Sequence, residues 1–206
     1  MEISLIQNIV YIFSSILFIT GIKMLGKEDT AVKGNFLSAI AMFVAVLVTF
    51  INISNPLILI AGIGLGAFIG SLIALKVKMT SIPEMVALFN GFGGLATFLI
   101  AWSEFNSTPD NLFQYILVMT TVYVGGITFT GSLVAYAKLS EKIQIAKTSI
   151  ITKLFTTIFY ISLVFLLYSA IVTPLLVTNF EFFTVLLVLT LLGGIGFVLP
   201  IGGGDM

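Results

Sequence analysis

The sequence predicts an all-α fold, a polytopic transmembrane helix bundle of about seven spans. Of its 206 residues, 59% are hydrophobic and only 9% are charged, and the mean hydropathy is +1.19. About a quarter of the residues in a soluble domain are charged, whereas a helix crosses a bilayer with about 20 apolar residues. Seven such spans would leave no room for a soluble nucleotide-binding domain, so we expect residues 1–206 to form a single transmembrane domain.

Seven apolar stretches mark the expected spans. They are continuous and lack the alternation of barrel strands, which indicates helices, the other structure whose backbone is satisfied within lipid. The stretches cover residues 6–22, 36–53, 57–75, 85–102, 112–137, 150–172 and 182–199. The fifth is longer than a span requires, so we expect it to tilt or to extend beyond the membrane.

Lysines sort the loops into two kinds and predict the orientation. They flank the first, third and fifth loops, whereas the second, fourth and sixth loops contain no Lys or Arg. The flanking residues are Lys23, Lys27, Lys33, Lys76, Lys78, Lys138, Lys142 and Lys147. Because cytoplasmic loops are enriched in basic residues, the N-terminus is predicted outside and the residues after the seventh span in the cytoplasm.

The composition also excludes several classes of function. Without Cys or His, the chain has no thiol nucleophile, no thiolate ligand and no imidazole proton relay. Nine basic residues balance nine acidic ones, so no basic surface for nucleic acid is expected. We predict no catalytic, metal-binding or cofactor-binding residues on this chain.

Glycines recur in the third stretch, at Gly62, Gly66 and Gly70. This spacing lets transmembrane helices approach closely, so a role in helix packing is predicted. Gly64 adds a superficial likeness to a dinucleotide-binding loop, but no strand precedes it.

The fourth stretch carries two polar candidates, Glu84 and Asn90. Glu84 follows Pro83 at the start of the expected helix, where an acid suits the helix dipole; a functional role is the alternative. Asn90 shares a face with Gly94 and Thr97. A buried amide either joins two helices by a hydrogen bond or lines a hydrated path, and both interpretations stay open.

The fifth stretch has a small, hydroxyl-bearing face formed by Gly125, Thr128, Ser132 and Ala135. Such hydroxyls commonly bond back to their own helix, but the face could equally border a narrow, water-filled passage. From the residues alone, the chain is interpreted as a polytopic subunit of a proton or ion path.

Two segments resemble the beta subunit of proton-translocating NAD(P) transhydrogenase. Residues 78–96 contain Met79-Thr-Ser-Ile-Pro-Glu84, and residues 126–139 contain Thr128-Phe-Thr-Gly-Ser132. The closing segment Ile-Gly-Gly-Gly-Asp-Met, residues 201–206, is similar to a family segment with alanine at its fourth position. The matches follow the family order along nearly the whole chain.

The resemblance implies the front part of a nine-helix membrane domain, with an NADP(H)-binding domain beyond residue 206. It implies an alpha subunit that binds NAD(H) and a dimeric complex. The absence of Arg beside plentiful Lys, Ile and Phe indicates an AT-rich, bacterial genome, so we expect a location in the inner (plasma) membrane of a bacterium. Protons moving inward would drive hydride transfer from NADH to NADP+ between the soluble domains. This chain alone would bind neither nucleotide and would not be catalytic.

The resemblance also implies four proton-path residues. Asn90 falls where many members have a histidine, and an amide cannot exchange protons near neutral pH as imidazole does. Ser132 matches a family serine of the same path, and Asp205 matches the acid after the seventh helix. Glu84 is a further candidate. Two other hypotheses are a stand-alone small ion or proton channel or transporter subunit, and a membrane scaffold without a path.

Overall fold

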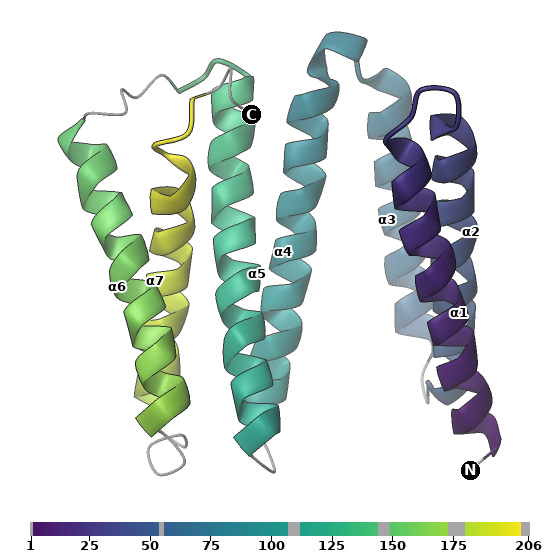
Figure 1. Ribbon diagram of the computed structural model, residues 1–206, viewed down its shortest axis with the longest axis horizontal. Coiled ribbons are helices and arrows are strands. Elements are labelled where there is room, and N and C mark those ends of the chain that lie inside the picture. Colours follow the sequence, from purple (N-terminus) through teal and green to yellow (C-terminus); the bar gives the residue numbers. More distant parts are fainter. Residues whose placement is uncertain (1, 54–55, 107–111, 144–148, 173–179, 203–206) are drawn as a thin grey trace. The chain divides into compact units, whose positions relative to one another are not determined.

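The computed structural model describes residues 2–53, 56–106, 112–143, 149–172 and 180–202, and in these ranges every regular element is a helix (Figure 1). The all-α prediction is therefore confirmed. The α-helices are α1 (Glu2–Leu25), α2 (Ala31–Thr49), α3 (Pro56–Lys76), α4 (Ile82–Asn106), α5 (Leu112–Leu139), α6 (Ile150–Val172) and α7 (Phe180–Val198). Two short 3-10 helices, η1 (Phe50–Asn52) and η2 (Met79–Ser81), follow α2 and precede α4.

The helices agree with the seven expected spans but extend beyond several of them. α4 begins at Ile82 rather than at residue 85, and α2 begins at Ala31 rather than at residue 36. The reason is that hydropathy marks apolar residues, whereas a helix continues into polar sequence for as long as its backbone bonds continue. Six of the described helices are long and apolar enough to cross a membrane; the described apolar part of the seventh, Phe183–Val198, is shorter.

The chain divides into two compact units, residues 1–75 and 76–206. In the first unit, α1 packs against α2 at a point where small residues meet. A Cβ placed on Gly34 would lie 2.7 Å from the Gly21 carbonyl oxygen, and a Cβ on Gly21 would overlap the Ser38 hydroxyl. Further along the pair, the Gln7 side-chain amide donates a hydrogen bond to the Val48 carbonyl oxygen (3.1 Å). Only residues without bulky side chains permit this approach of two backbones.

The helix α3 differs from the other helices of the described chain because none of its residues is buried. Within the described ranges, nothing lies within 4 Å of a Cβ placed on Gly62, Gly64, Gly66 or Gly70. The packing role predicted for the glycines at 62, 66 and 70 therefore has no partner within this unit and stays a prediction.

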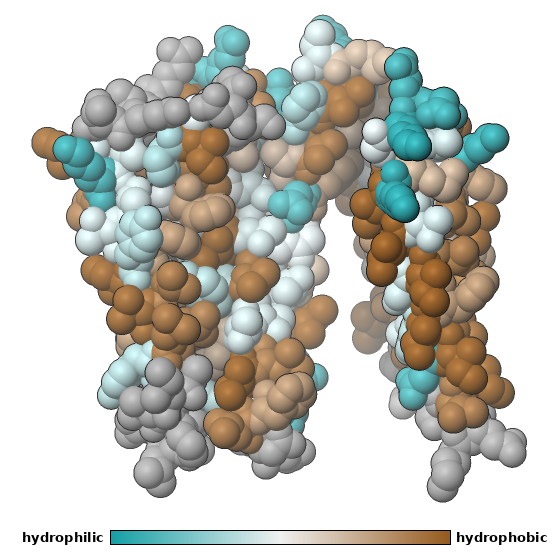
Figure 2. Space-filling model, viewed as in Figure 1, coloured by the Kyte–Doolittle hydropathy of each residue, from teal (hydrophilic) through white to brown (hydrophobic). Residues whose placement is uncertain are grey.

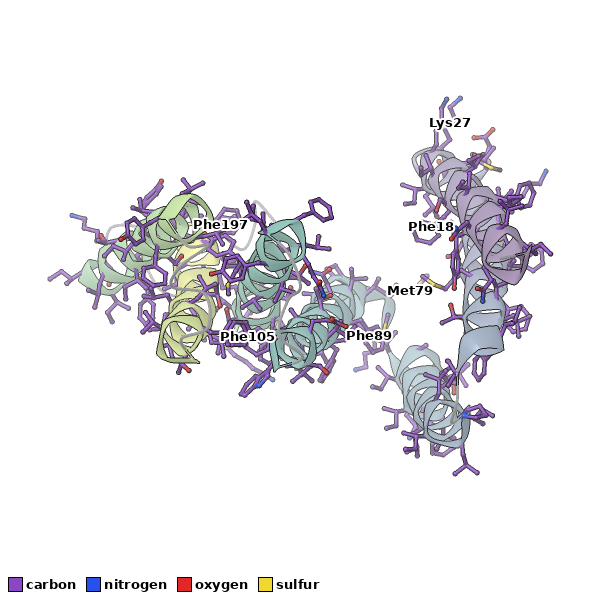
Figure 3. All side chains as sticks on the ribbon, turned by 90° about the horizontal axis from the view of Figure 1, so that it is seen from below. Phe18, Lys27, Met79, Phe89, Phe105 and Phe197 are labelled. Carbon is purple, nitrogen blue, oxygen red and sulfur yellow. The ribbon has the colours of Figure 1, made fainter. Side chains whose placement is uncertain are left out.

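The second unit is a row of four helices in the order α4, α5, α7 and α6 (Figure 3). Its core lies where α4, α5 and α7 meet, and Met119, Val122, Phe183 and Leu186 are almost completely buried there. At one end of this core, the rings of Phe105 and Phe183 stack with centroids 3.7 Å apart. The row fixes α5 between α4 and α7, so residues on opposite sides of α5 contact different helices.

Large apolar side chains are exposed along the helices of both units, and on the face shown in Figure 2 they are most continuous on the helices of the first unit. Leu, Ile, Val and Phe side chains on α1, α2 and α3 are widely exposed, while hydrophilic residues gather around the turn between α1 and α2 (Figure 2). Contiguous apolar exposure of this extent is unusual for a soluble monomer and is expected where lipid is the solvent.

Candidate functional site

The two small-residue faces predicted on the fourth and fifth stretches meet each other in the structure. A Cβ on Gly94 would lie 3.0 Å from the Gly125 carbonyl oxygen and 2.9 Å from the Thr128 Cβ. A Cβ on Gly125 would lie 2.7 Å from the Phe98 backbone nitrogen. Because no side chain separates the backbones here, short polar side chains one turn away can reach across the interface.

Asn90 and Ser132 are joined across this interface. The Asn90 Nδ2 donates a hydrogen bond to the Ser132 Oγ at 2.9 Å. Ser132 is only 8% exposed, whereas Asn90 lies at the exposed edge of the interface. Gly91 provides the space for this contact, since a Cβ there would lie 3.2 Å from the Ser132 Cβ. The two residues chosen separately from the sequence therefore form one polar pair.

A shallow cavity of about 230 Å³, open to the outside of the helix row, adjoins the pair and is lined by residues of α4, α5 and α7. It is lined by Asn90, Ile127, Thr128, Gly131, Ser132, Ala135, Phe197 and Val198. One water needs only about 10–15 Å³ of such volume and two to four polar partners. The amide of Asn90 and the hydroxyls of Ser132 and Thr128 can supply these partners in an otherwise apolar surrounding, so the site is suited to hold a few oriented waters.

Among the described contacts, none joins Glu84 or Asp205, the other two polar candidates, to the Asn90–Ser132 pair. Glu84 is half-buried in the first turn of α4, six residues and about 9 Å of helix rise from Asn90. Asp205 lies outside the described residues. Thr97, predicted on the same face as Asn90, donates its hydroxyl to the Gly93 carbonyl oxygen of its own helix at 3.0 Å.

A buried lysine at the end of α5 was missed by the sequence analysis, which interpreted it only as an orientation signal. Lys138 is 9% exposed, and its Nζ donates hydrogen bonds to the carbonyl oxygens of Val198 (3.1 Å), Leu199 (2.5 Å) and Ile201 (2.6 Å). The available signal was its position seven residues after Gly131, on the face that packs against α7.

The described residues offer no group of three or more His, Cys, Asp or Glu that could hold a metal ion. Asn90 and Ser132 are themselves neutral hydrogen-bonding groups. An amide and a hydroxyl do not titrate near neutral pH, but both can donate to and accept from water.

Comparison of the sequence with known proteins assigns the chain to a family. The family profile described as NAD(P) transhydrogenase beta subunit matches residues 7–206. The chain belongs to the NAD(P) transhydrogenase beta subunit family. The resemblance noted in the two polar segments is thereby confirmed, and the profile covers Asn90, Ser132 and Asp205 alike.

Curated relatives agree with this membership. Two of them, each named NAD(P) transhydrogenase subunit beta, come from Rhodospirillum rubrum, one of them from a designated strain. Each is 30% identical over 140 residues, which are 63% of this chain and 30% of the relative. The matched part of the chain thus spans 30% of the length of these transhydrogenase subunits.

Proposed function

We propose that this chain contributes a proton path to the membrane domain of a proton-translocating NAD(P) transhydrogenase, and that the path passes the Asn90–Ser132 pair. The observation that carries the proposal is the 2.9 Å hydrogen bond between these two side chains beside a cavity large enough for water. The family membership supplies the reaction to which such a path would be coupled.

The pair would act by holding water rather than by carrying the proton itself. One N–H of Asn90 is bonded to Ser132, and the amide carries a second N–H and a carbonyl oxygen that can bind water. The Ser132 hydroxyl, which accepts from Asn90, can rotate to donate to a water in the cavity. A proton could then pass along the ordered waters, and Glu84 and Asp205 are the acidic residues that we assign to the same path.

The complete complex would contain parts that this chain does not provide. We place the NADP(H) site on a further domain of the beta subunit and the NAD(H) site on an alpha subunit, both joined to additional membrane helices in a dimeric complex of a bacterial inner membrane. Hydride transfer would occur between those domains, and this chain would bind neither nucleotide. The family name and the bacterial relatives support this assignment.

The test is a double-mutant cycle in the assembled complex, reconstituted in vesicles. Asn90→Leu, Ser132→Ala and the double variant are compared for proton uptake coupled to hydride transfer from NADH to NADP+. Each single change should slow coupled transfer by roughly tenfold or more, and the double change should add little, because partners in one hydrogen bond are not additive. Thr97→Val is the matched control, since the Thr97 hydroxyl bonds within its own helix.

Three results would contradict the proposal. Unchanged coupling in both single variants would show that the pair only joins two helices, as in a membrane scaffold. Proton conduction by the unaltered chain without nucleotides or an alpha subunit would instead support the stand-alone channel hypothesis. Measurable NADPH affinity of the isolated chain would disprove the assignment of both nucleotide sites to other domains.

A further inference from the structure

The end of α7 is held by a side chain from another helix. The last carbonyl groups of an α-helix have no partner within the helix, and the dipole makes this end negative. Here Lys138 of α5 donates to the carbonyl oxygens of Val198, Leu199 and Ile201 at 2.5–3.1 Å. The Thr156 hydroxyl of α6 donates to the Gly196 carbonyl oxygen at 3.2 Å. The end of α7 is thus bonded to both neighbouring helices.

The contact between Lys138 and the end of α7 is buried and does not lie on the exposed surface. An ammonium group has three N–H donors, and three carbonyl oxygens converge on this one. Lys138 is 9% exposed and Leu199 is 3% exposed. A charge removed from water is costly unless it is well bonded, and the three carbonyl oxygens of the peptide leaving α7 help to stabilise the buried ammonium group.

The same helix connects this lysine to the polar pair. Lys138 follows Ser132 by six residues on α5, about 9 Å of helix rise, and the Val198 residue that it binds also lines the cavity beside Ser132. We propose that Lys138 is a positioning residue, which holds the segment leaving α7, from Val198 to Ile201, in register with the proton path. The inference rests on the proposed function for its effect on coupling, but its structural part is independent of that function.

The chain offers a matched pair of lysines for the test. Lys142 lies four residues further along and is exposed; its Nζ bonds to the Tyr136 hydroxyl at 3.2 Å. Lys138→Met removes the buried ammonium while keeping an unbranched side chain, and Lys142→Met removes one exposed charge from the same region. Since exposed charges contribute little to stability, Lys142→Met should behave as the unaltered protein in each measurement.

The first measurement is hydrogen exchange in the assembled complex, which requires no catalytic activity. The amides of Leu199 and Ile201 donate to Ile195 and Val198, so they report directly on the order of this segment. Lys138→Met should accelerate their exchange by roughly ten- to a hundredfold, since a hydrogen bond to a charged group is worth a factor of that size. Equal exchange in the Lys138→Met and Lys142→Met complexes would overturn the inference.

The second measurement is the number of protons moved per hydride transferred. A purely structural defect lowers the amount of active complex but leaves this ratio unchanged, whereas a mispositioned segment lowers the ratio. We expect Lys138→Met to lower it at least severalfold and Lys138→Arg to retain an intermediate value, because guanidinium keeps the charge but not the compact donor geometry.

If Lys138→Met does not accumulate in membranes, the Lys138→Arg variant provides the test, and an unaltered ratio and exchange rate in that variant would overturn the inference. If the unaltered complex itself moves no protons, the proposed function fails while the exchange result still stands.

Discussion

The helices α3 and α5 are both rich in small residues at spacings of three and four, yet their surroundings are opposite. Nothing in the described chain lies within 4 Å of a Cβ placed on any glycine of α3. In α5, a Cβ on Gly125 would meet the α4 backbone, and a Cβ on Gly126 would lie 2.6 Å from the Thr190 hydroxyl of α7. A small-residue pattern therefore shows that a helix can be approached closely, and the rest of the fold decides what approaches it.

Substitution of Gly125 should give the largest effect of this comparison. In Gly125→Leu, the new side chain would start 2.7 Å from the Phe98 backbone nitrogen, so α4 and α5 would have to separate. Overpacking a core typically costs about 1–3 kcal/mol, and contact with backbone should bring the cost to the upper part of this range or beyond it. The unfolding temperature and membrane accumulation should both fall sharply, whereas Gly64→Leu in α3 should lower neither. Equal loss in the two variants would break the comparison.

Replacement of Asp205 tests the proton-path role that the family resemblance implies for this residue. Asp205→Asn should lower proton uptake coupled to hydride transfer by roughly tenfold or more, because groups that exchange protons in a coupled step contribute at least that factor. Asp29→Asn is the control, since Asp29 is an exposed acid in the turn between α1 and α2. Normal proton pumping by the Asp205→Asn complex would remove this residue from the path.

The predicted packing role of the α3 glycines can be tested within one helix. Gly66 belongs to the proposed stripe, whereas Gly64 lies on nearly the opposite side of α3. If the stripe binds a helix of the complete complex, Gly66→Leu should weaken the assembled complex in detergent by about 1 kcal/mol or more, and Gly64→Leu should not. Equal stability of the two complexes would leave the stripe without a packing role.

The smallest effect is expected for Gly64→Ala. Glycine within a helix is less favourable than alanine by roughly 0.5–1 kcal/mol, and no neighbour restricts a methyl group at this position. The variant should unfold at a slightly higher temperature than the unaltered chain, while the matched change Gly126→Ala should unfold at a lower one. A lower unfolding temperature for Gly64→Ala would reveal a contact of α3 that is absent from the first unit.

The fold class was predictable from the sequence because lipid leaves a continuous apolar stretch few alternatives to a helix. The sixth expected span, residues 150–172, coincides with α6 (Ile150–Val172), and the fifth differs from α5 only at its C-terminal end. Helix ends were less predictable where polar residues such as Lys33 continue the helix beyond its apolar part. The orientation inferred from the lysines stays a prediction.

The candidate site was predictable in its residues but not in its contacts. Asn90 and Ser132 stood out because polar side chains are rare within membrane spans, and periodicity placed each on a face of small residues. That the two faces meet depends on which helices pack together. The hydrogen bonds of Lys138 to α7 were harder to predict from the sequence, because 60 or more residues separate the partners.

The sequence by itself determined that this chain is a polytopic helical protein with a polar pair of candidates, because hydropathy and helical periodicity are local properties. It also carried the family resemblance, which the profile match confirms. Only the tertiary structure decided that Asn90 bonds Ser132, that Lys138 is buried against the end of α7, and that the glycines of α3 lack a partner in their own unit. These outcomes depend on how distant helices pack together, which no local stretch of sequence encodes.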